Sequence, residues 1–252
     1  MSGSRGTAVV TGAGRGIGRT VAHRLRRDGY DLLVVDRDGD TAACVAAQVE
    51  GRAAVIDVTD ADAVATLTTL APECTALINN AALTLYTPLL ETPVQEARLV
   101  LDVNLVAMLS GAQALAPTIA ANGGGAIVNL SSITARAHPP NTGMYSASKA
   151  AVEQLTRGLA LELGPAGVRV NAVAPGTVPT EGSNSHYGQG DTLTRRAAIH
   201  PLGRLGVTDD IANAVSWFCS PESSYVTGQV LAVDGGYLIS QGQLFRLARG
   251  AP

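Results

Sequence analysis

Short runs rich in valine, isoleucine and leucine alternate along the chain with longer, alanine-rich stretches whose apolar residues have helical spacing. Each short run is bounded by polar or turn-forming residues, which predicts a strand buried on both faces. Seven strands are predicted, at residues 7–11, 31–36, 53–58, 75–80, 126–132, 168–174 and 229–234. Helices are predicted near residues 16–29, 40–50, 60–71, 93–121, 144–164 and 208–219. This alternation predicts an α/β fold: a doubly wound sheet of seven mainly parallel strands with helices on both faces.

We expect a single domain over residues 1–252, because a chain of this length that is 46% hydrophobic can bury one large core. One segment, residues 180–204, departs from the alternation: it is polar and rich in glycine and serine, with only a short helical pattern inside. It follows the sixth predicted strand, and doubly wound sheets bind ligands beyond the carboxyl ends of their strands. The segment is therefore predicted to be a lid over a substrate; the alternative is a disordered surface insertion.

The charge and the cysteine content exclude several classes of protein. The net charge is −3 with 15% charged residues, and no basic cluster of the kind that nucleic-acid binding requires is present. The N-terminus lacks the features of a signal peptide and no apolar stretch reaches 18 residues, which predicts a cytoplasmic protein with no membrane partner. Cys44, Cys74 and Cys219 are far apart and odd in number, and the four histidines lack metal-ligand spacing, so we expect neither a disulfide framework nor a metal site.

The stretch VVTGAGRGIG predicts a strand, a glycine-rich turn and the start of a helix. In such a turn Gly12 permits the tight bend, Gly16 lets the backbone approach a pyrophosphate, and Gly18 allows the helix to pack closely on the sheet. Asp36 ends the second predicted strand, where a carboxylate can accept hydrogen bonds from a ribose diol. Together these residues indicate a Rossmann-like dinucleotide site, the alternative being a purely structural glycine turn.

Lys149 is the only lysine of the chain, whose other basic residues are all arginine. It follows Tyr145 by four residues, so on a helix the two side chains share one face. An ammonium about 5 Å from a phenol lowers the pKa of the phenol by roughly two units at an effective dielectric constant of ~20. A compact cation that must serve a phenol and a ribose together favours lysine over the broad guanidinium of arginine. The alternative is that the single lysine is an accident of composition.

Two further polar residues accompany this pair: Ser132, at the end of the fifth predicted strand, and Asn104, upstream of it. With the motifs TGAGRGIG, NNAA, YSASK and PGTVPT, these residues make the chain resemble the short-chain dehydrogenase/reductase family over nearly its full length. The family's NNAG motif is NNAA here, with Ala82 in the place of the glycine.

The resemblance implies that Tyr145 is the general acid or base at the substrate oxygen, that Ser132 binds that oxygen, and that Lys149 lowers the tyrosine pKa and binds the nicotinamide ribose. Asn104 is expected to support a water that leads from the lysine towards solvent. The neighbouring hydroxyl of Ser131 is expected to point the other way, because side chains alternate along a strand. Cofactor contacts are expected from Gly12, Arg15, Gly16, Ile17, Gly18, Asp36, Arg37, Asp57, Val58, Asn79, Ala81, Tyr145, Lys149, Pro175, Gly176, Val178 and Thr180.

The resemblance implies an NAD(H)-dependent alcohol dehydrogenase or ketone reductase that acts on a small secondary alcohol or ketone. It also implies a homotetramer, with the helices that bear Asn104 and Tyr145 at one interface. One alternative is an NADP(H)-dependent 3-oxoacyl-thioester reductase, against which Asp36 argues; another is a catalytically idle dinucleotide sensor, which would not need a proton relay. The candidate substrate loops carry His138, His186 and Tyr187 and the cations Arg136, Arg195 and Arg196, none of which identifies a substrate.

Overall fold

The computed structural model describes residues 4–182 and 191–240. Its centre is a sheet of seven strands, all parallel, in the order β3-β2-β1-β4-β5-β6-β7. The predicted doubly wound α/β fold is therefore confirmed. The strands are β1 (Thr7–Thr11), β2 (Asp31–Asp36), β3 (Arg52–Val55), β4 (Cys74–Asn79), β5 (Gly125–Leu130), β6 (Val168–Pro175) and β7 (Val230–Val233). The helices are α1 (Gly16–Arg27), α2 (Gly39–Gln48), α3 (Ala61–Ala65), α4 (Leu67–Leu70), α5 (Val94–Leu101), α6 (Ala107–Ala121), α7 (Gly143–Leu163), α9 (Asp191–Ile199) and α10 (Thr208–Cys219).

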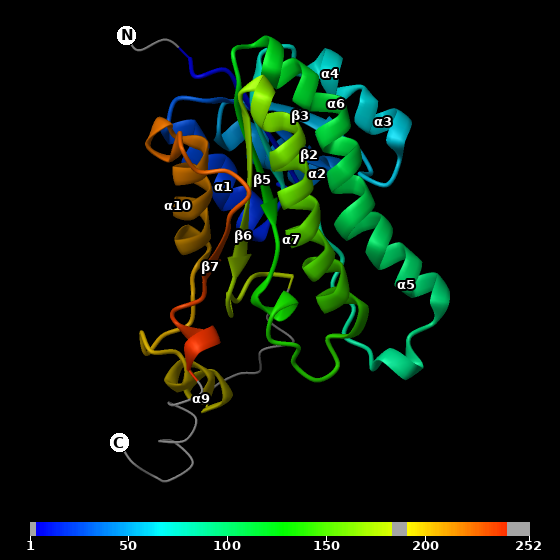
Figure 1. Ribbon diagram of the computed structural model, residues 1–252, viewed down its shortest axis with the longest axis vertical. Coiled ribbons are helices and arrows are strands. Elements are labelled where there is room, and N and C mark those ends of the chain that lie inside the picture. The colour runs from blue at the N-terminus through cyan, green and yellow to red at the C-terminus, as the bar shows by residue number, and fades with distance from the viewer. Residues whose placement is uncertain (1–3, 183–190, 241–252) are drawn as a thin grey trace.

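Alternate residues of each strand face opposite sides of the sheet, and each side has its own apolar core. On one side Val10 and Val34 belong to a cluster with residues of α1, α2 and α10. On the other side Val9 and Val35 belong to a cluster with residues of α4, α6 and α7. Figure 1 shows α1 and α10 on one side of the sheet and α6 and α7 on the other. Because both faces are covered, the central strands read in the sequence as continuous apolar runs.

The two edge strands differ from the prediction of strands buried on both faces. In β3, Arg52, Ala53 and Val55 are exposed and only Ala54 is buried. The strand β7 is partly buried, with Leu231 39% exposed. Each of these strands has a neighbouring strand on one side only.

Two of the predicted helices are interrupted. The stretch predicted near 60–71 forms two short helices, α3 and α4, that are separated at Thr66. Between α5 and α6 the chain passes through a π-helical segment, Asp102–Val106. Apolar residues repeat at helical spacing through both regions, and the sequence pattern does not reveal these local breaks.

The helical run Val94–Ala121 is 28 residues long and apolar enough, by length and composition alone, to cross a membrane. This finding corrects the expectation that no apolar stretch is long enough. In the structure α6 packs against β4, and its residues Leu115 and Ile119 are fully buried in the core. Packing against the sheet therefore accounts for the buried apolar residues of α6, whereas Leu99 and Val106 of the same run are about half exposed.

Since all strands are parallel, their carboxyl ends meet at one edge of the sheet, which is where doubly wound folds bind ligands. The residues at or just beyond these ends include Gly12, Asp36, Asn80, Ser132 and Gly176. The fold therefore gathers the candidate site residues from five strands at this edge.

We expect Leu115→Ala to lower the free energy of unfolding by about 2–5 kcal/mol, because a fully buried leucine in α6 would leave a cavity. Urea titration monitored by circular dichroism measures this change. The matched control is Leu90→Ala, at a fully exposed leucine, which should change the free energy of unfolding by less than about 0.5 kcal/mol. Equal losses in the two variants would contradict the assignment of α6 to the core.

Candidate active site

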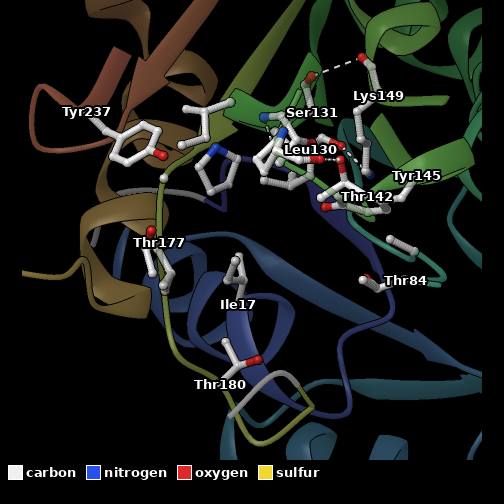
Figure 2. Close-up of a pocket in the computed structure, with 18 of the residues that line it drawn as sticks. Ile17, Thr84, Leu130, Ser131, Thr142, Tyr145, Lys149, Thr177, Thr180 and Tyr237 are labelled. Atoms are coloured by element: carbon white, nitrogen blue, oxygen red, sulfur yellow. Dashed lines mark hydrogen bonds between the residues drawn. The ribbon is translucent and has the colours of Figure 1, made fainter. Parts of the chain in front are cut away.

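A cavity of about 340 Å³ lies at the carboxyl edge of the sheet. Tyr145, Lys149 and Ser132 line one part of it. Figure 2 shows Tyr237 across the cavity from Tyr145, with Ile17 of α1 between them at the cavity floor. The structure therefore brings three of the four expected catalytic residues to one cavity wall.

A second cavity of about 280 Å³ lies beside the glycine-rich turn and includes Asp36 and Arg37 in its lining. Asn80 and Ala82 line both cavities, so the two spaces adjoin along this edge of the sheet. The expected cofactor residues that line one or the other are Gly12, Arg15, Ile17, Asp36, Arg37, Asp57, Val58, Ala81, Tyr145, Lys149, Pro175, Gly176, Val178 and Thr180.

The glycine-rich turn depends on the absence of side chains at four positions, one of which, Gly16, has φ +56°. Gly12 has φ +61°, and a Cβ on Gly18 would lie 2.3 Å from the carbonyl oxygen of Gly12. A Cβ on Gly14 would lie 2.3 Å from Oγ1 of Thr41, a role that the sequence reasoning did not assign. The N-cap residue of α1 is Arg15, whose guanidinium can only donate hydrogen bonds, and it makes no side-chain cap to the N–H groups at the helix start. This geometry fits a dinucleotide pyrophosphate.

Asp36 lies at the end of β2 with its carboxylate on the second cavity. The backbone N–H of Gly14 donates to Oδ2 at 2.9 Å, and the N–H of Asp38 donates to Oδ1 at 3.2 Å. These bonds fix the carboxylate and leave each oxygen a further lone pair for a ribose hydroxyl. Asp57, by contrast, accepts from the N–H and Oγ1 of Thr59 at 2.9 and 2.7 Å, and these bonds lower its pKa.

The start of the candidate lid is attached to α1. Arg19 in the first turn of α1 forms an ion pair with Glu181 at 2.7 Å. The hydrogen bond from Arg19 is the main reason why the pKa of Glu181 is lowered. Of residues 180–204, the structure describes 180–182 and 191–204, which include α9; His186 and Tyr187 lie outside the described residues.

Tyr145 and Lys149 occupy one face of α7, as the spacing of four residues predicts. Nζ of Lys149 lies 5.7 Å from the centre of the Tyr145 ring and donates a hydrogen bond to the carbonyl of Leu130 at 2.8 Å. The side chain is fully buried, and this desolvation lowers the pKa of Lys149 from 10.5 to about 7. Its charge therefore changes near neutral pH, whereas the argument from the sequence took the side chain to be an ammonium.

The two adjacent serines face different partners. Ser131 donates from Oγ to the backbone carbonyl of Lys149 at 3.1 Å, towards α7 (Figure 2). Ser132 caps a 3-10 turn, and its Oγ accepts hydrogen bonds from the N–H and Oγ1 of Thr134 at 3.2 and 3.1 Å.

Asn104 lies inside the π-helical segment and is completely buried. Its Oδ1 accepts from the N–H of Leu83 at 2.7 Å, while Nδ2 donates to the carbonyl of Leu83 at 2.9 Å and to Oγ of Ser148 at 3.0 Å. The side chain thus ties the loop after β4 to the residue that precedes Lys149. It lines neither large cavity, and the expected water path stays a prediction.

The structure does not bring the side chain of Asn79 to either large cavity. Its amide is buried and donates to Oδ1 of Asn129 on the neighbouring strand at 2.9 Å. The cavity position belongs to the next residue, Asn80, whose Nδ2 donates to the carbonyls of Thr11 and Gly12, both at 2.9 Å. Side-chain alternation at the end of β4 could have indicated that adjacent asparagines face opposite ways.

Ala82 fits the position where the family has glycine. Among the described residues, Glu50 and Asn141 are the only residues other than glycine with positive φ. The backbone at Ala82 therefore does not require glycine.

Sequence reasoning missed several residues that line the large cavity, because no motif marks them. The ring of Tyr86 contacts the Tyr145 ring edge-on, with 6.1 Å between centroids. Of the cations considered, Arg196 lines this cavity, whereas Arg136 pairs with Glu153 at 3.2 Å. The other cavity residues that were not predicted include Thr84, Thr134, Thr142, Thr177 and Tyr237, and the lining also contains Leu130, Ser131, Ile133, Pro139 and Pro140.

The described ranges, 4–182 and 191–240, contain no group of three or more His, Cys, Asp or Glu side chains that could hold a metal ion.

Comparisons with known proteins agree with this geometry. A family model described as enoyl-(acyl carrier protein) reductase matches residues 12–238. Galactitol 2-dehydrogenase (L-tagatose-forming) of Cereibacter sphaeroides is 40% identical over 248 residues, which cover 92% of this chain and 94% of the relative.

Two solved structures share the fold closely. That of 7α-hydroxysteroid dehydrogenase complexed with NADH and 7-oxo glycochenodeoxycholic acid has a TM-score of 0.86 and 33% identity, covering 92% of this chain and 94% of that chain. A structure described as an NAD(P)-dependent gluconate 5-dehydrogenase from Beutenbergia cavernae, with bound NADP, has a TM-score of 0.86 and 36% identity, covering 94% and 98% of the two chains.

The buried amine predicts a pH dependence of stability. Because the folded-state pKa of Lys149, about 7, lies below its ordinary value of 10.5, the unfolded chain holds an extra proton between these values. Stability should therefore rise with pH from about 7 towards 10.5. Relative to wild type, Lys149→Met should be stabilised most near pH 6.5, with the difference shrinking by about pH 9, as measured by urea unfolding at each pH.

The control for this experiment is Arg157→Met, which removes a half-exposed cation from the same helix. Its stability should follow the pH curve of the wild type. Parallel curves for wild type and Lys149→Met would show that burial of the amine does not control its protonation.

Proposed function

The chain belongs to the short-chain dehydrogenase/reductase family, and we propose that it is an NAD(H)-dependent oxidoreductase that transfers a hydride between nicotinamide and a secondary alcohol or ketone. The observation that carries this proposal is the meeting of Tyr145, Lys149 and Ser132 at one cavity that adjoins a second cavity bearing Asp36. Tyr145, Lys149 and Ser132 are suited to proton transfer at a substrate oxygen. Asp36 is suited to accept hydrogen bonds from a ribose.

The dinucleotide would lie along the edge of the sheet, across both cavities. Its pyrophosphate would face the start of α1, its adenosine ribose Asp36, and its adenine Asp57 and Val58. When bound, the cofactor supplies the hydride or accepts it. Side chains of the protein would bind the substrate oxygen and transfer the proton.

Tyr145 would give a proton to the substrate oxygen during ketone reduction and take one during alcohol oxidation. Ser132 would donate a hydrogen bond to the same oxygen and hold it beside the phenol. Lys149, when protonated, would favour the phenolate and so ease the loss of the tyrosine proton. Its buried position, with a pKa of about 7, lets it exchange a proton near neutrality.

NAD(H) is the proposed cofactor because Asp36 would stand where NADP carries its 2′-phosphate. The carboxylate is held towards the cavity by two backbone N–H groups and would repel a phosphate there. Arg37 and Arg15 line the same cavity and would weaken this repulsion. Use of both NAD(H) and NADP(H) is therefore the second candidate.

The proposed substrate is a small polyhydroxylated alcohol or ketone. The cavity around Tyr145 is rich in hydroxyl groups, including those of Thr84, Tyr86 and Tyr237, and no carboxylate is among its described lining residues. The relative named for galactitol and L-tagatose supports this choice. A thioester reductase, which the description of the family model suggests, is the alternative within the same chemistry.

We also propose a cytoplasmic homotetramer. Leu99 and Val106 are about half exposed on the helical run that contains Asn104, and Leu161 is 80% exposed on the helix of Tyr145. Exposed apolar side chains on these neighbouring helices are suited to burial between subunits.

Replacement of Tyr145 by phenylalanine should abolish turnover and leave dinucleotide binding nearly unchanged, because it removes the transferable proton and little else. Steady-state kinetics with ketones and polyols, together with calorimetric titration of NADH, measure the two effects. Tyr225→Phe, at a fully exposed tyrosine, should behave as wild type. Retention of more than about a tenth of the wild-type kcat would show that Tyr145 is not the acid or base.

Asp36→Ala should lose NADH efficiency and gain NADPH efficiency, because the repulsive carboxylate and the ribose contact disappear together. Wild type should favour NADH by about 10²-fold in kcat/KM, since every ~1.4 kcal/mol is tenfold. Asp40→Ala removes an exposed carboxylate in the first turn of α2 and should leave the ratio unchanged. A wild-type preference for NADPH would overturn the cofactor assignment.

A further inference from the structure

The 3-10 turn that follows β5 gives Ser132 an unusual set of hydrogen bonds. Its Oγ accepts from the backbone N–H of Thr134 at 3.2 Å and from Oγ1 of the same residue at 3.1 Å. Thr134 is half-buried and lies on the wall of the large cavity beside Ser132. One threonine thus supplies two donors to the serine that faces the substrate.

A hydroxyl oxygen has one proton to donate and two lone pairs with which to accept. The N–H of Thr134 can only donate, so it occupies one lone pair of Ser132 Oγ; when Thr134 Oγ1 donates to the other, the remaining capacity of Ser132 is its O–H donor. No hydrogen bond donated by Ser132 Oγ to another described residue is present, while Ser131 directs its own proton to α7. The hydroxyl proton of Ser132 is therefore available to a group in the cavity that Ser132 lines.

The turn is fixed from both sides, which keeps this arrangement in place. Ser131 binds the carbonyl of Lys149, and Arg136, just after the turn, pairs with the buried carboxylate of Glu153 at 3.2 Å. Ile133, between the two hydroxyl residues, is itself buried. Anchors on α7 therefore hold the segment on either side of the turn.

We infer that Thr134 is a positioning residue that makes Ser132 a dedicated hydrogen-bond donor to the substrate oxygen. The inference rests on the proposed function, in which that oxygen is a carbonyl or an alcohol. In both reaction directions the oxygen beside Tyr145 needs a donor, since negative charge develops on it. A serine with a free lone pair could instead accept from a substrate hydroxyl and would lose this orientation.

The test compares Thr134→Val with Thr134→Ser in ketone reduction. Thr134→Val keeps the shape and the backbone donor but removes the hydroxyl donor, so kcat should fall about fivefold with little change in the KM for ketone or NADH. Thr134→Ser retains the hydroxyl and should restore kcat to within about twofold of wild type. Thr68→Val removes a comparable hydroxyl, bonded to the carbonyl of Ala65 at 2.9 Å, from a remote helix and should leave kcat unchanged.

A double-mutant cycle separates positioning from direct substrate contact. In the Ser132→Ala background, Thr134→Val should have no further effect, because the donor that it orients is already absent. A rise in the KM for ketone that persists in that background would overturn the inference, as would an unchanged kcat in Thr134→Val. Thermal unfolding of each variant verifies that it is folded, and an impaired but folded Thr134→Ser would also count against the inference.

Failure of the proposed function is distinguishable from failure of this inference. If wild type reduces ketones and Tyr145→Phe does not, the proposed function stands, and the Thr134 variants decide the inference alone. If wild type transfers no hydride to any ketone tested, the proposed function fails and the inference falls with it.

Discussion

The hydrogen bond from Nζ of Lys149 to the carbonyl of Leu130 joins the helix of the proton-transfer residues to the end of the central strand. A buried amine loses its hydration, which lowers the pKa of Lys149 to about 7, and the carbonyl of Leu130 accepts a hydrogen bond from it in place of water. The contact requires α7 to lie close against the end of β5. Ser131 supports that approach by binding the carbonyl of Lys149, and Asn104 supports it from behind through Ser148. The hydrogen bond from Lys149 to the carbonyl of Leu130 holds α7 against the end of β5. Tyr145 and Lys149 on α7 therefore lie close to Ser132, which follows β5.

The strands and most helices could be predicted because interior positions are uniformly apolar. Val9 and Val10 face opposite cores, and both must be hydrophobic when helices cover both faces of the sheet. The edge strand β3 could not be recognised as an edge from this pattern, since its order in the sheet is a property of the whole topology. The π-helical segment around Asn104 was equally invisible, because apolar residues fill most positions around it and hide the shift in helical phase that an extra residue in a turn produces.

The candidate site was predictable where chemistry dictates both residue type and spacing. Gly18 must lack a side chain because the Gly12 carbonyl occupies that space, and Tyr145 and Lys149 must be four apart to share a helix face. The far wall was not predictable, because Tyr237 comes from the segment after β7 and meets the site only through the tertiary fold. Residues that line a substrate cavity form no local motif by which a single sequence would reveal them.

The solitary lysine has a consequence beyond chemistry at the site. Lys149 is 1% exposed, so an endoproteinase that cuts only after lysine has a single target in all 252 residues, and folding conceals it. Cleavage would divide the chain once, into residues 1–149 and 150–252, each time α7 leaves the sheet long enough to be bound by the protease. The rate of cleavage at Lys149 would therefore measure how often α7 separates from the sheet, at a residue that belongs both to the core and to the proposed active site.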